Sequence, residues 1–244
     1  MNSKLPKNLG IIMDGNRRWA KLNGYPIIKG HYFGTSALKK IIKKCSSLGI
    51  KELTVFAFST ENWKRVPEEV ELLIGLIERF IQSEIAELKS KNVKLIIIGD
   101  KIKFGTRLNK LFKKAEELTI NNTGMKLNVA LNYGGKKDIL FGVKNIFKDI
   151  KTGKINEDDI NEILFKDYLL SSDVGDIDLL IRTSGEQRIS NFLLWQIAYT
   201  EFYFTDTLWP DFNENELEKA LIKYEYRDRR FGSTSTKKFE KVEN

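Results

Sequence analysis

The chain has 244 residues, 41% of them hydrophobic and 11% aromatic, so it can bury a sizeable core and is not a disordered chain. Its 41 lysines and arginines against 33 aspartates and glutamates give a formal charge of +8, which favours an anionic partner: nucleic acid, acidic lipid or phosphorylated metabolite. The single cysteine, Cys45, excludes an internal disulfide and a cysteine-based zinc site, and no apolar run approaches the roughly 20 residues that span a bilayer.

The first predicted strand covers residues 9–13 and stops at Asp14-Gly15-Asn16, after which a helix begins with Arg17 and Arg18. A strand–loop–helix edge of this kind is where α/β sheets bind ligands, and a helix N-terminus attracts anions. The arginines add positive charge, and Asp14 could hold a divalent cation on the same anion. On these residues alone, a simple Asp-Gly turn before a solvated basic helix explains the pattern equally well.

The rest of the chain alternates between strand-like and helical patterns. Strands are predicted at 52–58, 93–98, 127–131, 177–181 and 202–204, and helices at 31–48, 67–91, 104–118, 138–148, 157–164 and 213–224. Because helices separate the strands, we expect an α/β fold with a mostly parallel six-stranded sheet flanked by helices. Residues 1–232 are expected to form a single catalytic domain, followed by a polar, mobile tail at 233–244.

Chemically active residues collect after the predicted strands. Arginines, small hydroxyl residues and glycines occur at 14–18, 58–65, 132–135 and 182–191, and we place Glu201 in the same group. Guanidinium groups bind phosphate oxygens in pairs and glycine lets backbone N–H groups approach closely, so this composition predicts a diphosphate site. The carboxylates of Asp14 and Glu201 are suitable ligands for Mg²⁺.

Several common catalytic motifs are absent from the sequence. There is no GxxxxGK[ST] loop, no GxGxxG fingerprint, no GxSxG and no DDxxD cluster, and His31 is the only histidine. These absences argue against a nucleoside triphosphatase, a dinucleotide-dependent enzyme, a Ser-His-Asp hydrolase and a helical trans-type prenyl synthase.

Six segments together resemble the motif set of the cis-prenyltransferase family, in particular its bacterial undecaprenyl diphosphate synthase branch. They are IIMDGNRRWAK, the pair Gly30-His31, FAFSTENWKR, LNYGG, LLIRTSGEQRISNFLLWQIAYTEFYFTDTLWPDF and RDRRFG. They occur in the family's order and cover nearly the whole chain. The resemblance implies Mg²⁺-dependent condensation of isopentenyl diphosphate onto an allylic diphosphate such as farnesyl diphosphate, giving a polyprenyl diphosphate near C55, undecaprenyl diphosphate for cell-wall lipid carrier. It also implies a homodimer with a hydrophobic tunnel beside the sheet.

The resemblance assigns roles at the allylic diphosphate. Asp14 would position Mg²⁺ and assist departure of that diphosphate. Binding is assigned to the residues that follow it and to the histidine: Gly15, Asn16, Arg17, Arg18 and His31. His31 would donate a hydrogen bond to phosphate or shuttle a proton, although a lone histidine near a helix start is otherwise a capping or packing residue.

The isopentenyl diphosphate site is assigned to Arg182, Arg188 and Ser190, with surface salt bridging as the alternative. Glu201 resembles the family's second metal-linked carboxylate, reaching a Mg²⁺ site across the dimer. Arg230 and Gly232 resemble the C-terminal segment that completes the partner's site, although by composition they are part of a basic tail.

Asn62 would assist proton removal from the condensing unit through a hydrogen-bond network with its neighbours. Further substrate contacts are assigned to Trp19, Ser59, Thr60, Glu61, Trp63 and Arg65, with Trp63 alternatively a lid or packing aromatic. The tunnel is assigned to Ala57, Leu73, Ile77, Phe80 and Met125, although an apolar helix face is more often ordinary core.

Two residues depart from the family pattern: Ile27 stands where an arginine often contacts diphosphate, and Gln187 where a histidine often sits near the metal. Arg17 or Lys29 could compensate for the first. The alternatives are a shorter-chain cis-prenyl diphosphate synthase, a non-catalytic partner subunit of the same fold, and a nucleic-acid-binding protein, for which no module is visible. We expect a cytoplasmic protein that binds no nucleic acid and contacts the inner face of the membrane peripherally for product release.

Overall fold

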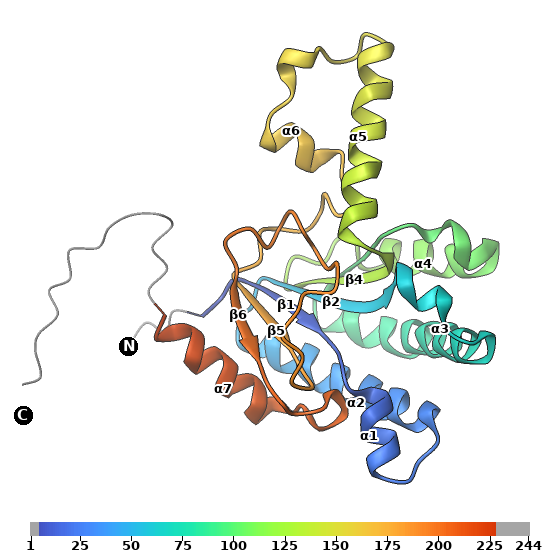
Figure 1. The fold of residues 1–244 in the computed structure, drawn as a ribbon, viewed down its shortest axis with the longest axis vertical. Coiled ribbons are helices and arrows are strands. Elements are labelled where there is room, and N and C mark those ends of the chain that lie inside the picture. The colour runs from blue at the N-terminus through green and yellow to red at the C-terminus, as the bar shows by residue number, and fades with distance from the viewer. Residues whose placement is uncertain (1–4, 228–244) are drawn as a thin grey trace, which may run out of the picture.

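One parallel sheet organises the protein, as the computed structural model of residues 5–227 shows (Figure 1). Its strands lie in the order β3-β4-β2-β1-β5-β6, and every neighbouring pair is parallel. Their bounds are β1 (Asn8–Ile12), β2 (Glu52–Ser59), β3 (Lys94–Ile98), β4 (Lys126–Tyr133), β5 (Leu179–Arg182) and β6 (Glu201–Phe204). The predicted six-stranded α/β sheet is therefore confirmed, and it is wholly parallel.

Within residues 5–227, six α-helices connect these strands and a seventh follows β6. They are α1 (Asn16–Leu22), α2 (Ile27–Ser47), α3 (Pro67–Ser90), α4 (Gly105–Thr119), α5 (Gly135–Lys151), α6 (Glu162–Asp167) and α7 (Glu214–Glu225), with 3₁₀ turns at η1 (Thr60–Lys64), η2 (Lys101–Phe104), η3 (Glu157–Asp159) and η4 (Trp209–Asp211). The single helix predicted at 157–164 is wrong, because η3 ends and α6 then begins separately. The Asn161 side chain caps α6 by accepting hydrogen bonds from the N–H groups of Ile163 and Leu164, which requires an extended residue between the two helices.

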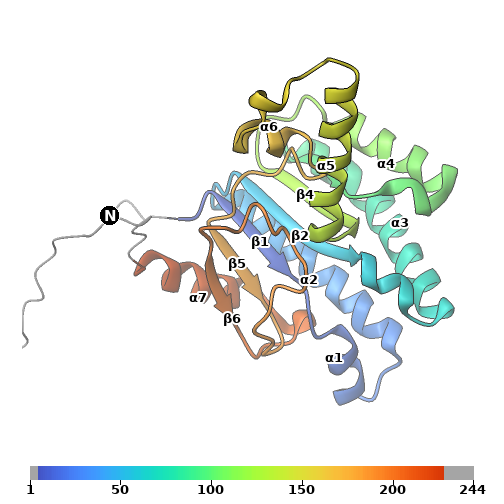
Figure 2. The ribbon, with the colours of Figure 1, turned by 45° about the horizontal axis from the view of Figure 1, so that its top comes forward.

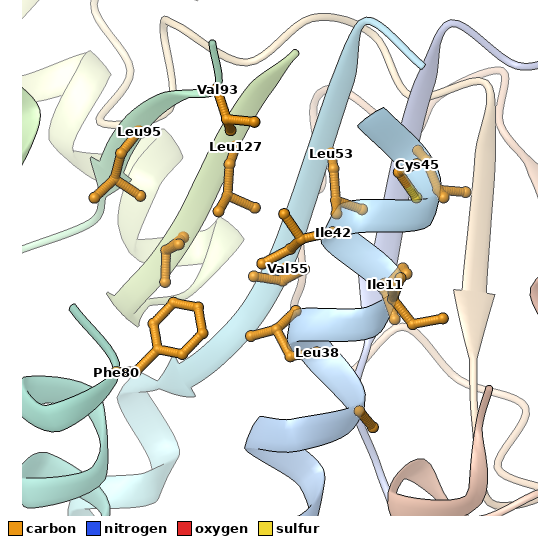
Figure 3. Packing of buried hydrophobic residues seen from close by; sticks show 14 of the residues in the cluster. Ile11, Leu38, Ile42, Cys45, Leu53, Val55, Phe80, Val93, Leu95 and Leu127 are labelled. Carbon is orange, nitrogen blue, oxygen red and sulfur yellow. The ribbon is translucent and has the colours of Figure 1, made fainter. Parts of the chain in front are cut away.

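The core has two halves, one on each face of the sheet. Helices α2, α3, α4 and α7 cover one face, where side chains such as Ile11, Val55 and Leu127 meet Leu38 and Phe80 of the helices (Figures 1 and 3). The segment 174–197 packs a smaller cluster against the other face. Because the central strands are buried on both sides, they read as nearly continuous apolar runs.

Helices α5 and α6 extend away from the sheet (Figures 1 and 2). At its base α5 is fixed by Asp138, which accepts hydrogen bonds from Tyr133 Oη at 2.7 Å and from the N–H of Leu170 at 2.6 Å. Farther along, α5 exposes four large apolar side chains, those of Leu140, Phe141, Val143 and Phe147. Between residues 5 and 227, no helix is both long and apolar enough to cross a membrane.

Candidate functional site

The site lies where the sheet topology changes direction, between β1 and β5. From β1 the chain runs through α1 and α2 to β2 on one side, whereas from β5 it runs to β6 on the other. Connections that diverge in this way leave a crevice at the carboxyl ends of the strands. The register pairs Ile12 with Arg182 across these two strands, so Asp14 and Arg182 face the same crevice.

Arg182 is the buried charge at the centre of this crevice, with 3% of its surface exposed. Its guanidinium donates hydrogen bonds to Asp14 Oδ2 at 2.7 Å, to Ser190 Oγ at 2.7 Å and to the backbone carbonyl of Arg188. The Arg188 guanidinium itself is 60% exposed and pairs with Glu186. The structure therefore brings Asp14, Arg182 and Ser190 together, while Arg188 contributes its carbonyl and leaves its charge at the rim.

The Asp14 loop is fixed to neighbouring segments by backbone contacts. The N–H of Asp14 donates to Thr183 Oγ1 at 2.9 Å, and the N–H of Trp209 donates to the Asp14 carbonyl at 3.0 Å. Gly15 follows with φ of 109°, and a Cβ there would approach Leu208 and Ser184 to 3.0 Å. Glycine is therefore required at 15, because other residues disfavour this backbone conformation and lack the space.

The arginines after Gly15 extend in different directions. Arg18 donates to the carbonyl of Ser184 at 2.9 Å and to its hydroxyl at 2.5 Å, and it lies 3.1 Å from Glu186. Arg17 lies 3.4 Å from Glu69 at the start of α3. Arg18 therefore connects α1 to the loop after β5, and Arg17 connects it to α3.

Glycines bring α1 and α2 close together near Asn16. A Cβ on Gly30 would lie 2.0 Å from the Asn16 carbonyl oxygen, and one on Gly34 would lie 2.2 Å from Asn16 Oδ1. His31, which follows Gly30 in the chain, lines the cavity together with Asn16. The Gly30-His31 pair thus places an imidazole against the Asp14 loop because glycine allows this approach.

Burial lowers the pKa of His31 to about 4. The positive charges of Arg65 and Arg17 also lower it, whereas the negative charge of Glu69 raises it. Its Nε2 is buried and has no hydrogen-bond partner among the described residues, lying 3.9 Å from Glu69 Oε1. A neutral imidazole with one uncommitted nitrogen can make a hydrogen bond to an incoming phosphate group.

Glu69 is a site residue that the sequence analysis missed. This buried carboxylate at the start of α3 accepts a hydrogen bond from Arg65 at 2.8 Å and also faces Arg17 and His31. It therefore pairs with two arginines assigned to the substrates, Arg17 and Arg65, and lies beside His31. The signal was present in the sequence, because Arg65 and Glu69 are four residues apart across the helix start.

The segment after β2 is held by its own polar contacts. Asn62 Oδ1 accepts a hydrogen bond from the N–H of Ser59 at 2.9 Å, and Trp63 Nε1 donates to Asn132 Oδ1 at 2.8 Å. Although burial opposes it, hydrogen bonds from its own backbone and from Ser59, Thr60 and Asn191 hold the pKa of Glu61 below its ordinary value. Glu61 is therefore ionised beside Asn62, while the Trp63 ring packs between Phe58 and Phe104.

One cavity of about 590 Å³ joins these polar groups to an apolar passage. Its polar end includes Asp14, His31, Arg182 and Ser190, and its apolar part lies between α2, α3 and the sheet. Among the residues predicted for the tunnel, it is lined by Ala57, Leu73, Ile77 and Phe80. Met125 is instead buried in the core and lies outside the lining, because it precedes β4 at the opposite edge of the sheet.

Comparison with known proteins identifies this architecture. Residues 12–232 match the family model for undecaprenyl diphosphate synthase. The chain belongs to the undecaprenyl diphosphate synthase family. It is 51% identical to the isoprenyl transferase of Clostridium perfringens over 232 residues, covering 95% of this chain and 92% of that protein. It is 50% identical to the farnesyl-diphosphate-specific ditrans,polycis-undecaprenyl-diphosphate synthase of Aliivibrio fischeri over 230 residues, covering 94% and 90%.

The fold is also similar to that of a solved structure. The crystal structure of lavandulyl diphosphate synthase from Lavandula x intermedia, in complex with dimethylallyl diphosphate, matches with a TM-score of 0.91 and 40% identity, covering 93% of this chain and 98% of that one. As a member of this family the chain is a cis-prenyltransferase, which confirms the resemblance drawn from the motifs.

Members of this prenyltransferase family generally use a divalent metal, and the donor set here fits one held jointly with substrate. Within residues 5–227 no three His, Cys, Asp or Glu side chains gather into a group that could hold a metal alone. Asp14 supplies a single carboxylate, about a third exposed, at the polar end of the cavity. A hard cation such as Mg²⁺ is commonly held by one or two carboxylates together with substrate phosphates and water.

The placement of Glu201 with the carboxyl-edge residues is wrong. Glu201 is the first residue of β6 and pairs in register with Leu179, the first residue of β5, so it lies at the amino edge of the sheet. Its carboxylate accepts a hydrogen bond from Arg227 at 2.5 Å. The error came from treating a strand's first residue as if it followed the strand, and within this chain Glu201 does not join Asp14.

The remaining predicted residues have simpler positions. Trp19 Nε1 donates to Asp211 at 2.7 Å and its ring lies against Tyr25 and Phe33. Ile27 begins α2 and is exposed, as is Gln187, and neither lies in the cavity lining. Arg230 and Gly232 lie outside the described residues.

Proposed function

We propose that this chain elongates prenyl chains by Mg²⁺-dependent condensation of isopentenyl diphosphate onto farnesyl diphosphate, forming cis double bonds and giving undecaprenyl diphosphate. The observation that carries the proposal is a continuous cavity that begins at Asp14, His31 and Arg182 and continues as an apolar passage along α3. Such a cavity suits a substrate with a charged head and a growing hydrocarbon tail. The printed name of the Aliivibrio fischeri relative supports the same substrate and product.

The two diphosphates would occupy opposite sides of Asp14. Arg182 and Ser190, with Arg188 at the rim, would bind isopentenyl diphosphate, because a buried guanidinium with a hydroxyl beside it suits phosphate oxygens. The allylic diphosphate would be bound by the start of α1 and the neighbouring histidine, namely Gly15, Asn16, Arg17, Arg18 and His31. Each new diphosphate would displace existing contacts of these arginines with Glu69 and Glu186.

The reaction breaks the bond between the allylic carbon and its diphosphate oxygen, forms a carbon–carbon bond to the isopentenyl unit, and releases a proton from that unit. A bound Mg²⁺ would neutralise charge on the departing diphosphate. Asp14 would be the residue that holds this ion, and the proton would leave through the hydrogen-bonded group of Ser59, Glu61 and Asn62. The apolar passage would exclude water from the reactive allylic carbon.

The partners that we propose follow from the surface. The exposed apolar side chains of α5 would pack against a second copy of the chain and give a homodimer. The product's hydrocarbon chain belongs in a bilayer, so we place the enzyme in the cytoplasm with peripheral contact at the inner face of the membrane. Arg230 and Gly232 would contribute to the partner's isopentenyl diphosphate site.

The test is incubation with farnesyl diphosphate, labelled isopentenyl diphosphate and Mg²⁺, followed by solvent extraction of the label. We expect extractable polyprenyl diphosphate that requires the allylic primer and disappears with a chelator. Absence of extractable product with every short allylic primer would contradict catalysis and favour a non-catalytic subunit. The similarity to lavandulyl diphosphate synthase makes a short-chain product the second candidate, which product length in the same assay distinguishes.

A further inference from the structure

Asn191 lies where three loops meet at the carboxyl edge of the sheet. Its Nδ2 donates to Glu61 Oε1 at 3.2 Å in the loop after β2. Its Oδ1 accepts from the N–H of Lys136 at 2.9 Å, and its backbone carbonyl accepts from the N–H of Gly135 at 2.7 Å, both at the start of α5 after β4. Asn191 itself follows β5 and lines the cavity. One side chain thus joins the ends of three strands.

The backbone at this position is unusual. Asn191 has φ of 65° and Ser190 has φ of 46°. Both angles lie in the left-handed region of the backbone, which residues other than glycine rarely adopt. Asparagine tolerates this region better than most residues. The contact also depends on Gly134, where a Cβ would lie 2.7 Å from Asn191 Nδ2 and 2.7 Å from Thr60 Oγ1. The glycines after β4 and the asparagine after β5 therefore form two sides of one close contact.

The contacts of Asn191 fix the position of Ser190, which is a hydrogen-bond partner of the buried Arg182. Ser190 immediately precedes Asn191, and its hydroxyl accepts a hydrogen bond from Arg182 at 2.7 Å. A shift of Asn191 would move Ser190 Oγ away from Arg182, and it would also release Glu61 beside Asn62. We propose that Asn191 is a positioning residue that sets the isopentenyl diphosphate subsite by tying Ser190 to the loops after β2 and β4. This inference rests on the proposed function and assigns Asn191 no direct contact with substrate.

The chain supplies a matched control in Asn92. Asn92 has φ of 57°, its Oδ1 accepts from the N–H of Thr123 at 2.8 Å, and its carbonyl accepts from the N–H of Gly124 at 3.1 Å. It precedes β3 and so lies at the amino edge, away from the cavity. Asn191 and Asn92 therefore make the same kind of contact in the same backbone conformation at opposite edges of the sheet.

The experiment compares Asn191→Gly with Asn92→Gly in the full-length protein, because glycine keeps the left-handed backbone and removes only the side chain. We measure Tm, the KM values for isopentenyl and farnesyl diphosphate, and kcat. Asn191→Gly should raise the KM for isopentenyl diphosphate about tenfold and leave that for farnesyl diphosphate within twofold. Asn92→Gly should lower Tm comparably while all kinetic constants stay within twofold of wild type.

Asn191→Asp is the second variant, should the glycine variant fail to fold. It keeps the acceptor for Lys136 and places a carboxylate against Glu61, so the KM for isopentenyl diphosphate should rise, and the like-charge contact should also lower Tm. Wild-type KM values in either folded Asn191 variant, or equal kinetic losses in Asn191→Gly and Asn92→Gly, would overturn the positioning role. An inactive wild-type protein would instead contradict the proposed function, so the two failures are distinguishable.

Discussion

Asp14 and Arg182 form the contact on which the site depends, because a buried guanidinium needs a counter-charge and here it is the carboxylate in the crevice. Asp14→Asn keeps an oxygen for Arg182 but removes the charge. We expect kcat to fall by about 100- to 1,000-fold, the size of effect seen when one preorganised electrostatic group is removed. Because Arg182 is buried and loses its counter-charge, the variant should also lose about 1–3 kcal/mol of unfolding free energy, moderated by water at Asp14, which is about a third exposed.

Asp178→Asn provides the control for this measurement. Asp178 accepts hydrogen bonds from the N–H groups of Lys7 at 2.8 Å and Asn8 at 2.9 Å, at the amino edge of the sheet. Its substitution should lower stability without changing kcat by more than about twofold. Near-native turnover in a folded Asp14→Asn variant would contradict the assignment of Asp14.

His31 gives the site a pH-dependent stability. Its pKa of about 4 lies below the unfolded value near 6.5, so the unfolded state binds the proton first and stability falls as pH drops from 7 towards 4. The His31→Gln side chain cannot be protonated in this range. Between pH 7 and pH 5, the free energy of unfolding of this variant should therefore fall by about 1–2 kcal/mol less than that of the wild-type protein. Denaturant unfolding at the two pH values measures this. Equal losses would show that His31 is not held neutral among Arg17, Arg65 and Glu69.

At this scale the sequence predicts residue type better than position. Asp14, Arg182 and Ser190 could be grouped because parallel strands share a carboxyl edge, and the structure places them in contact. Glu201 was misplaced because it was grouped with the residues that follow strands, although the predicted strand at 202–204 comes after it and β6 begins at Glu201 itself. The spacing of Arg65 and Glu69 was visible in the sequence, but Glu69 was missed because its other neighbours, Arg17 on α1 and His31 on α2, are distant in the chain.

The helices α1 and α2 depend on glycine for their close approach. Gly30→Ala would place a methyl group 2.0 Å from the Asn16 carbonyl oxygen and 3.1 Å from Ala20 Cβ, so the two helices must separate. We expect the free energy of unfolding to fall by about 1–3 kcal/mol, because the helices no longer pack closely. The KM for the allylic diphosphate should rise, because the Asp14 loop moves with α1. Thermal unfolding and steady-state kinetics test both effects.

Gly75→Ala is the matched substitution within a helix. A Cβ at Gly75 on α3 meets only the end of the Arg79 side chain, at 4.0 Å, so the change should stabilise the protein by about 0.5–1 kcal/mol. If Gly30→Ala behaves like Gly75→Ala, the close packing of α1 on α2 is not a constraint on the site.

Elements with strong periodicity were predictable from the sequence, and those with weak periodicity were not. Pro67 and the wide apolar face marked α3, and apolar runs marked the central strands, because burial on one or two faces leaves a clear pattern. The segment 157–164 is polar, and its two short helices depend on side-chain caps from Asn156 and Asn161 that periodicity does not detect.

At the scale of the whole molecule, the exposed apolar face of α5 predicts self-association. Leu140→Ser with Phe147→Ser should shift a dimer towards monomer and weaken association at least tenfold, because about 1–2 kcal/mol is expected for each buried apolar side chain lost. Sedimentation velocity over a range of concentrations measures this. Ile222→Ser, which alters an exposed apolar residue on α7, is the control, and a monomeric wild-type protein would contradict the dimer.

The central claim is that one chain holds two diphosphates beside Asp14 and directs a growing hydrocarbon along α3. Mass spectrometry of the extracted products, after incubation with farnesyl diphosphate, isopentenyl diphosphate and Mg²⁺, tests it most directly. The account predicts products that differ by whole isoprene units and accumulate at undecaprenyl length in the wild-type protein, with almost none from Asp14→Asn. Recovery of unextended farnesyl diphosphate from the wild-type protein would contradict it.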